Sequence, residues 1–189
     1  MKPAAFVLAG GRSSRMGRDK ALLLFDGRPL VQHVANQAGV VSHPVTLVGS
    51  ASRYANLGYP VIEDIFPGNG PLGGIHAALA HTVSDWNLIL ACDMPQATPD
   101  FLSQLSARAE GCGLSAVVPV SPDGLAQPLC AAYHRRCAGD MERALRTHIR
   151  KVADAIAAFD VDFWPVPESH YFRNLNTPED WSAYSHAAG

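Results

Sequence analysis

Two continuous runs of apolar residues, each ending directly at a glycine or an acidic residue, set the strongest limit on the fold. Phe6 to Ala9 has no polar side chain and leads into Gly10, and Leu88 to Cys92 leads into Asp93. A strand that is apolar at every position is buried on both faces, which is typical of inner strands in a parallel sheet covered by helices. Other short apolar runs alternate with amphipathic segments, and this alternation predicts β-α units. We therefore expect a three-layer α/β fold with a mostly parallel sheet.

Helix and strand patterns alternate along the rest of the chain. We expect helices from Pro29, Gly73, Thr98 and Thr177. Thr98 precedes a proline, which is the arrangement of an N-cap residue and a first helical position, and the segment from Thr177 has capping-box spacing. Further strands are expected at residues 45–48, 61–62, 116–118, 129–133 and 159–163. The last of these has Phe159, Val161 and Phe163 alternating with aspartates, so we expect one face of it to be wet.

Length and composition fit one globular unit with a substantial core. The chain has 189 residues, of which 48% are hydrophobic and 17% charged, and this is enough to bury a core without disulfides or metals. The formal net charge of −2 provides no general attraction for nucleic acid or an anionic membrane, and no apolar run approaches the length of a membrane span. The four cysteines form no C-x-x-C pair, and Cys92 is expected to be a small buried hydrophobe. We expect a cytoplasmic protein without nucleic-acid or membrane partners.

The segment after the first apolar run is the clearest candidate for a binding site. Gly10 and Gly11 let the backbone turn sharply and bring its N–H groups close to a ligand. The charged residues that follow are Arg12, Arg15, Arg18, Asp19 and Lys20. The spacing matches neither a Walker loop nor a dinucleotide fingerprint. A solvated basic loop is the alternative, but this density of positive charge in an acidic protein favours a site for the triphosphate of a nucleotide.

Two acidic residues follow strand-like runs and are candidate ligands. Asp93 should lie at the carboxyl edge of the sheet, where a carboxylate is a natural Mg²⁺ ligand beside phosphate oxygens. A turn or a helix N-cap is the alternative role for Asp93. Asp64 follows Val61 and Ile62 in the same way, and its neighbours also fit a simple turn.

Two further polar segments can contact a ligand. The glycines of residues 68–74 allow close approach of a flat group such as a base or ribose, with a flexible loop as the alternative. Asn176 is either a second metal or substrate contact, or a polar turn residue. The eight histidines show no arrangement for a metal site, and no nucleophile elbow is present, so the sequence does not indicate covalent catalysis.

In their order along the chain, these segments resemble the molybdenum cofactor guanylyltransferases, within the wider nucleotidyltransferase family of Rossmann-like fold. The resemblance rests on residues 8–17 with Lys20, Val61 to Asp64, Gly70 to Gly74, Cys92 to Pro95, Gln127 to Leu129, and Asn174 to Asp180. The related cytidylyltransferases tend to have two alanines before the glycine of the first loop, whereas this chain has Leu8, Ala9, Gly10 and Gly11. Gly73 also stands where many members have alanine. The resemblance implies one nucleotidyltransferase domain over residues 1–189 and a preference for guanine.

The resemblance also implies roles for individual residues. The nucleotide would be bound by Leu8, Ala9, Gly10, Gly11, Arg12, Lys20, Asp64, Pro71, Leu72, Gly73 and Asp93. Within this set, Asp64 would contact guanine or ribose and Asp93 would bind Mg²⁺. The implied catalytic residues are Arg15, Lys20 and Asp93. Gly49 is a departure, because some members have an asparagine there that touches the nucleotide.

The function that the resemblance implies is transfer of GMP from GTP to molybdopterin that carries molybdenum. The products would be the guanine dinucleotide cofactor and pyrophosphate, and Mg²⁺ would be the cofactor. GTP and molybdopterin would be the partners, with molybdoenzymes or their chaperones as candidates for receiving the product. Two alternatives stay open. One is a cytidylyltransferase acting on molybdopterin or another phosphorylated acceptor, and the other is a non-catalytic GTP-binding module.

Overall fold

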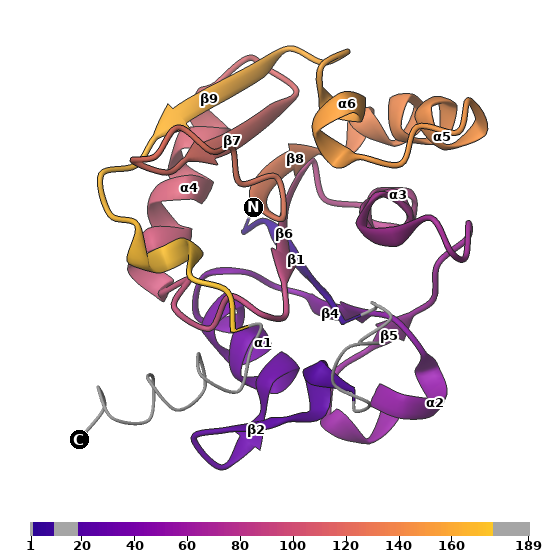
Figure 1. The fold of residues 1–189 in the computed structure, drawn as a ribbon, viewed down its shortest axis with the longest axis vertical. Helices are drawn as coiled ribbons and strands as arrows, with labels where there is room; N and C mark the ends of the chain where they lie inside the picture. Colours follow the sequence, from indigo (N-terminus) through magenta and orange to yellow (C-terminus); the bar gives the residue numbers. More distant parts are fainter. Residues whose placement is uncertain (1, 10–18, 176–189) are drawn as a thin grey trace.

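A seven-stranded sheet with helices on both faces forms the centre of the structure (Figure 1). The computed structural model describes residues 2–9 and 19–175 of the chain. The strands of the sheet are β1 Ala4–Leu8, β4 Val45–Val48, β5 Val61–Ile62, β6 Trp86–Ala91, β7 Ala116–Val120, β8 Cys130–His134 and β9 Val161–Pro165. The helices are α1 Leu30–Val41, α2 Ala51–Tyr54, α3 Gly70–His81, α4 Pro99–Gly111, α5 Ala138–Arg146 and α6 Val152–Ile156.

Smaller elements connect these. A short hairpin is formed by β2 Leu24–Phe25 and β3 Arg28–Pro29. The 3-10 helices are η1 Lys20–Leu22, η2 Ala55–Leu57, η3 Arg135–Cys137 and η4 His170–Phe172. In the part of the chain that the structure describes, no helix has the length and apolar character needed to cross a membrane.

The strand directions confirm the mostly parallel sheet. The strand order is β5-β4-β1-β6-β8-β7-β9. β5, β4, β1 and β6 run parallel to one another, and β9 runs parallel to β7. β8 is antiparallel to both β6 and β7. The residues that follow β1, β4, β5 and β6 therefore meet at one edge of the sheet, where open α/β folds bind their ligands.

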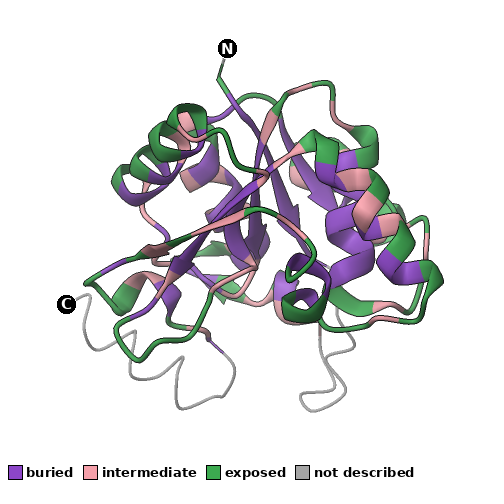
Figure 2. Ribbon diagram, turned by 90° about the horizontal axis from the view of Figure 1, so that it is seen from above, coloured by how far each residue is buried: buried purple, intermediate pink, exposed green. Residues whose placement is uncertain are grey.

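The apolar runs are buried on both faces, as the sequence predicts. All five residues of β1 are buried. Ala5 and Val7 pack in the core that includes α1 and α4, whereas Phe6 and Leu8 pack in the core that includes α3 and α5. Figure 2 shows the buried residues gathered on the strands and on the helix sides that face them. Two cores, one on each face of the sheet, thus hold the carboxyl ends of β1 and β6 in place.

The predicted starts of two helices are confirmed. Thr98 caps α4 by accepting a hydrogen bond from the Phe101 N–H at 3.4 Å, and Pro99 takes the first helical position. α1 begins directly after Pro29 and buries the predicted apolar face. In contrast, α3 begins at Gly70, three residues before the predicted start, because a proline suits the first turn of a helix. The helix predicted from Thr177 lies outside the described residues.

β9 has one exposed face, as the sequence predicts, but this is the face of Phe163 and not that of the aspartates. The Phe163 side chain is 52% exposed. On the opposite face, Asp162 forms an ion pair with Arg108 of α4, and Trp164 stacks on Phe101 of the same helix. The position of α4, rather than the alternation of apolar residues, decides which face of this edge strand is covered.

Candidate functional site

A cavity of about 170 Å³ opens at the carboxyl edge of β1 and β6. Its lining includes five residues that the sequence predicts to bind a nucleotide, namely Leu8, Ala9, Lys20, Pro71 and Asp93. Asp19 and Cys92 also line it. The strands β1 and β6, the 3-10 helix η1 and the start of α3 all contribute, so the cavity brings together segments that are far apart in sequence.

Lys20 and Asp93 form an ion pair in this cavity. Lys20 Nζ lies 2.9 Å from Asp93 Oδ2, and the two side chains are 14% and 24% exposed. Asp93 follows the buried strand β6, and Lys20 is the first residue of η1. The carboxylate therefore points to Lys20 instead of capping a helix, while the backbone at Cys92 and Asp93 forms a turn, which was the other alternative from the sequence. Two opposite charges with partial access to solvent can face a phosphate and its metal ion.

Asp64 lies against the first turn of α3. Its Oδ1 atom is buried and has no hydrogen-bond partner among the described residues, and burial raises the pKa of this carboxyl group. A methyl group added at Gly73 would lie 3.5 Å from Asp64 Oδ2, and one at Gly74 would lie 3.6 Å from Asp64 Oδ1. Both distances are ordinary van der Waals contacts, and the closer neighbours of such methyl groups would be the Phe66 carbonyl oxygen, 3.1 Å from that at Gly73, and Leu8 Cδ2, 3.2 Å from that at Gly74. An unpaired buried oxygen is costly, and a ligand that donates hydrogen bonds would satisfy it.

Not all predicted residues lie around the cavity. Asp64, Leu72 and Gly73 are not among the residues that line it. The Leu72 side chain is fully buried in the core beneath α3, so a side-chain contact from it to a ligand is ruled out. The predicted contacts at Gly10, Gly11, Arg12, Arg15 and Asn176 lie outside the described residues.

Cys92 is less buried than the sequence predicts, although it packs against the core that includes α1 and α4. It is partly exposed and lines the cavity beside Asp93. Its surroundings still raise the pKa of the thiol to about 12, mainly through burial and then through the neighbouring Asp93 carboxylate. The thiol is therefore neutral near pH 7 and is a poor nucleophile.

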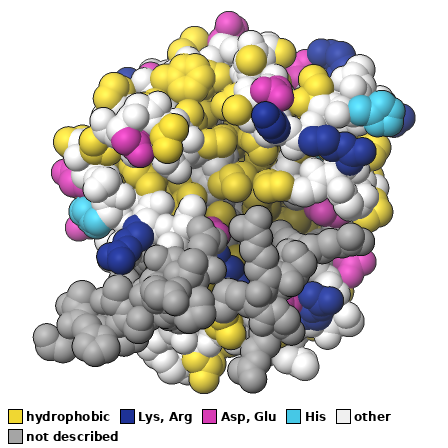
Figure 3. All heavy atoms as spheres, viewed as in Figure 1, with side chains coloured by type: hydrophobic (Ala, Val, Ile, Leu, Met, Phe, Trp, Pro, Cys, Tyr) yellow, Lys and Arg dark blue, Asp and Glu magenta, His cyan; other side chains and the backbone are white. Residues whose placement is uncertain are grey.

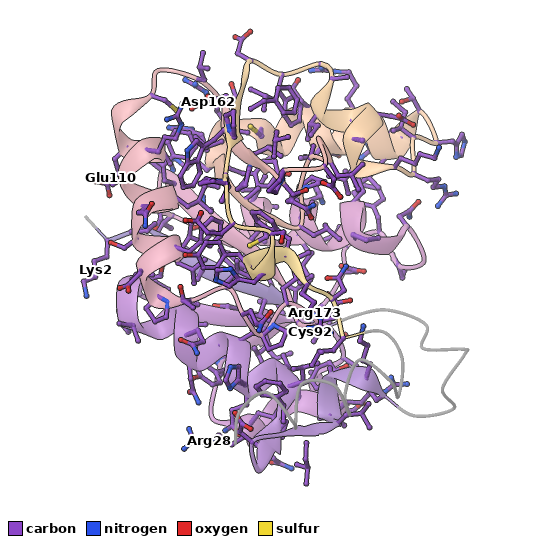
Figure 4. All side chains as sticks on the ribbon, turned by 60° about the vertical axis from the view of Figure 1, so that its left-hand side comes forward. Lys2, Arg28, Cys92, Glu110, Asp162 and Arg173 are labelled. Carbon is purple, nitrogen blue, oxygen red and sulfur yellow. The ribbon has the colours of Figure 1, made fainter. Side chains whose placement is uncertain are left out.

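The chain before the C-terminal segment returns to the same site. The Leu175 N–H donates a hydrogen bond to the Asp93 carbonyl at 3.0 Å. Figure 4 places Arg173 and Cys92 in the same region of the molecule. Asn174, which directly precedes Leu175, has a buried Oδ1 atom without a hydrogen-bond partner in the described part of the chain. Asn174 is thus a candidate contact that sequence reasoning did not single out, although it begins the last segment of the family resemblance.

Basic side chains also approach the segment before α3. The Arg146 guanidinium lies over the Phe66 ring, 5.7 Å from its centroid, and Arg150 donates a hydrogen bond to the Asn69 side chain. Figure 3 shows basic side chains gathered over α5 and the segment that leads to α6. No sequence pattern predicted this contact, because it depends on how α5 packs against α3.

The donor set limits which metal ion the site can hold. Among the residues that the structure describes, no group of three or more His, Cys, Asp or Glu side chains gathers as a metal site. Mg²⁺ commonly takes one or two protein carboxylates and completes its shell with phosphate oxygens and water. A single carboxylate such as Asp93, beside a cavity that can admit phosphates, fits that ion.

Comparison with known proteins places this chain in a family. A family model described as the MobA-like NTP transferase domain matches residues 5–160. A probable molybdenum cofactor guanylyltransferase from Methanothermobacter thermautotrophicus is 36% identical, over 92% of this chain and 94% of the relative. The molybdenum cofactor guanylyltransferase of Vibrio atlanticus is 33% identical, over 94% of this chain and 93% of the relative.

Solved structures share the fold. Molybdopterin-guanine dinucleotide biosynthesis protein A from Archaeoglobus fulgidus superimposes with a TM-score of 0.85 at 28% identity, covering 98% of both chains. The 2-C-methyl-D-erythritol 4-phosphate cytidylyltransferase of Thermus thermophilus has a TM-score of 0.76 at 16% identity, over 100% of this chain and 99% of that one. The second likeness shows the fold alone. The family match and these relatives together show that the chain belongs to the MobA-like NTP transferase domain family and is a nucleotidyltransferase.

Proposed function

We propose that this nucleotidyltransferase transfers GMP from GTP to molybdopterin that carries molybdenum, and releases pyrophosphate. The observation that carries the proposal is the Lys20–Asp93 pair at the carboxyl edge of the sheet, in a chain whose relatives are named guanylyltransferases. The pair supplies a cation for the phosphates and a carboxylate for a metal ion in one cavity. A module that only binds a nucleotide has little need of both.

The proposed chemistry needs positioning more than a strong base. The terminal phosphate of molybdopterin is already anionic, and it attacks the α-phosphorus of GTP in line. The bond from the α-phosphorus to the oxygen that bridges to the β-phosphate breaks, and pyrophosphate leaves with the electron pair. Lys20 stabilises negative charge on the phosphate oxygens, and Leu8 and Ala9 place their backbone beside the nucleotide. Arg15 is proposed to assist Lys20.

We propose Mg²⁺ as the cofactor, with Asp93 as its protein ligand. When bound, the ion neutralises charge on phosphate oxygens and orients them. Asp64 is proposed to contact guanine or ribose, since its unpaired buried oxygen can accept a hydrogen bond. Asn174 and Asn176 are candidates for further contacts.

Two basic side chains beside the segment that precedes α3 are proposed to contact the anionic acceptor, since molybdopterin carries a terminal phosphate. They are Arg146, which also forms an ion pair with Glu142 at 2.7 Å, and Arg150, and neither is among the residues that line the cavity. A guanidinium group matches the geometry of a phosphate. Transfer of the product to molybdoenzymes or their chaperones is part of the same proposal.

A nucleotide panel tests the function. Purified protein is incubated with molybdenum-loaded molybdopterin, Mg²⁺ and each of the four nucleoside triphosphates in turn, and pyrophosphate release is followed. We expect release with GTP at a rate well above that with CTP. A preference for CTP would favour a cytidylyltransferase, and GTP binding without pyrophosphate release would favour a non-catalytic module.

A further inference from the structure

The Tyr54 hydroxyl lies between the end of β1 and the start of η1. Its oxygen is 3.0 Å from the Ala9 carbonyl oxygen and 2.9 Å from Asp19 Oδ2. Tyr54 is only 2% exposed, and a phenol has a single hydrogen to donate, so the two acceptors share it. Ala9 and Asp19 are the described residues on either side of residues 10–18. One buried hydroxyl thus joins both flanks of the glycine- and arginine-rich segment.

We propose that Tyr54 is a positioning residue, whose hydroxyl fixes the end of β1 relative to η1 and thereby sets Lys20 in place for the phosphates. The expected effect of the hydroxyl on GTP turnover rests on the proposed function, whereas its expected effect on the start of η1 does not. Neither the family match nor the sequence motifs assign a role to this residue.

Asp19 connects the Tyr54 hydroxyl to the start of η1, where Lys20 lies. Asp19 Oδ2 accepts from the Tyr54 hydroxyl and lies 3.2 Å from Arg53 Nη1, while Asp19 Oδ1 accepts from the Ala21 N–H at 3.1 Å. The last bond caps η1, of which Lys20 is the first residue. A carboxylate held by both a hydroxyl and a guanidinium has little freedom, so the start of η1 has little freedom too.

Gly49 provides the space that the Tyr54 ring occupies. A methyl group added at Gly49 would lie 2.8 Å from Tyr54 Cε2 and 3.5 Å from Ala9 Cβ. Real side chains do not approach that closely, so any residue larger than glycine at this position would displace the ring. Gly49 is the position where some members of the resembled family have an asparagine. In this chain, the glycine and the tyrosine act as a pair, and Tyr54 uses the space beside Ala9.

A purely structural role for Tyr54 is the competing explanation. The ring packs in the core that includes α1 and α4, and a phenylalanine could fill that core equally well. The hydroxyl is what distinguishes the two explanations. Burial, followed by the hydrogen bond to Asp19, raises the pKa of Tyr54, so the hydroxyl keeps its proton and remains a donor near neutral pH.

The test compares Tyr54→Phe with Tyr59→Phe. Tyr59 also donates one hydrogen bond, to Asn36 Oδ1 at 2.5 Å, but its acceptor lies on α1, whereas Ala9 and Asp19, the acceptors of Tyr54, line the cavity. We expect Tyr54→Phe to lower kcat/KM for GTP about tenfold while KM for molybdopterin stays unchanged. Tyr59→Phe should keep wild-type kinetics. We expect its thermal midpoint to fall by about as much as that of Tyr54→Phe, because each variant loses one hydrogen bond. Equal kinetics in the two variants would overturn the proposal.

Two further measurements separate this proposal from the proposed function. Amide hydrogen exchange at Ala21, followed by NMR, should be faster in Tyr54→Phe and unchanged in Tyr59→Phe, whether or not the protein transfers GMP. Unchanged exchange at Ala21 in both variants would overturn the positioning role. Gly49→Ala keeps the hydroxyl but displaces the ring, and we expect it to change Ala21 exchange and GTP kinetics in the same direction as Tyr54→Phe. If the wild-type protein transferred no GMP but Ala21 exchange changed in the variants as expected, the proposed function would be rejected and the positioning role of Tyr54 would stand.

Discussion

Replacing Lys20 by methionine separates a catalytic role of the Lys20–Asp93 pair from a structural one. The charged atoms are 2.9 Å apart, and both side chains are less than one quarter exposed. At an effective dielectric constant near 20, two unit charges at this distance attract each other by about 6 kcal/mol. Desolvation of the two groups and the lost freedom of the lysine offset most of this, leaving a net contribution of about 1–2 kcal/mol to stability. Since each kcal/mol shifts Tm by about 2–4 °C for a chain of this size, we expect Tm to fall by about 2–8 °C.

The expected effect of Lys20→Met on the reaction is larger. Losing one preorganised charge from the phosphate site should lower kcat/KM by about 10² to 10³, which corresponds to about 3–4 kcal/mol of transition-state stabilisation. Asp93→Ala should cause a loss of similar size. The assay is the initial rate of pyrophosphate release at low GTP, with Tm measured on the same samples.

Arg108→Met is the matched control for Lys20→Met. It also breaks an ion pair, with Asp162, but Figure 4 shows Asp162 well away from Cys92, which is one of the residues that line the cavity. We expect a small fall in Tm and an unchanged rate for the control. If Lys20→Met lowered Tm yet kept its rate within about threefold of the wild type, the pair would be a structural ion pair and the reasoning from the cavity would be refuted.

Three other changes test the surroundings of the site. Gly74→Ala puts a methyl group 3.2 Å from Leu8 Cδ2 and 3.6 Å from Asp64 Oδ1. We expect GTP binding, measured by calorimetry, to become about tenfold weaker. Unchanged affinity would count against a tight fit of α3 against Leu8. Asp64→Asn should raise Tm at pH 7, because the folded state raises the pKa of Asp64 and is therefore penalised once pH exceeds the ordinary carboxyl value of about 4. This gain should shrink as pH falls towards 4, and a gain independent of pH would contradict the explanation. Iodoacetamide at pH 8 should alkylate Cys112 before Cys92, because the thiol of Cys92 has a pKa of about 12. Faster labelling of Cys92, measured by peptide mass spectrometry, would show that this thiol is more accessible than the structure indicates.

Much of the fold could be predicted because its signals are local. A strand that is buried on both faces is mostly apolar, so β1 and the part of β6 from Leu88 stand out as apolar runs, and the strand predicted at residues 45–48 coincides with β4. The buried Asn87 also belongs to β6, and the apolar pattern does not include it. Caps such as Thr98 depend on neighbouring residues alone. The exposure of Phe163 could not be predicted in this way, since it depends on where α4 lies over the sheet.

The site could be predicted in part for a similar reason. Lys20 and Asp93 are 73 positions apart, but each follows a buried parallel strand, and such strands end at one edge of the sheet. That rule does not reach Tyr54, which bonds from α2 to two residues of the cavity, or Arg150, which bonds to Asn69 from the segment between α5 and α6. Their contacts arise from the packing of helices on the sheet, and no residue spacing in the sequence predicts that packing.

The most direct test of the account follows the α-phosphate of GTP. The protein is incubated with molybdenum-loaded molybdopterin, Mg²⁺ and GTP labelled with ³²P at either the α- or the γ-position, and the products are separated by chromatography. We predict that the α-label enters a dinucleotide containing guanine and molybdopterin, while the γ-label appears in pyrophosphate. Transfer of the γ-label to the acceptor, or α-label incorporation from CTP in preference to GTP, would contradict the account.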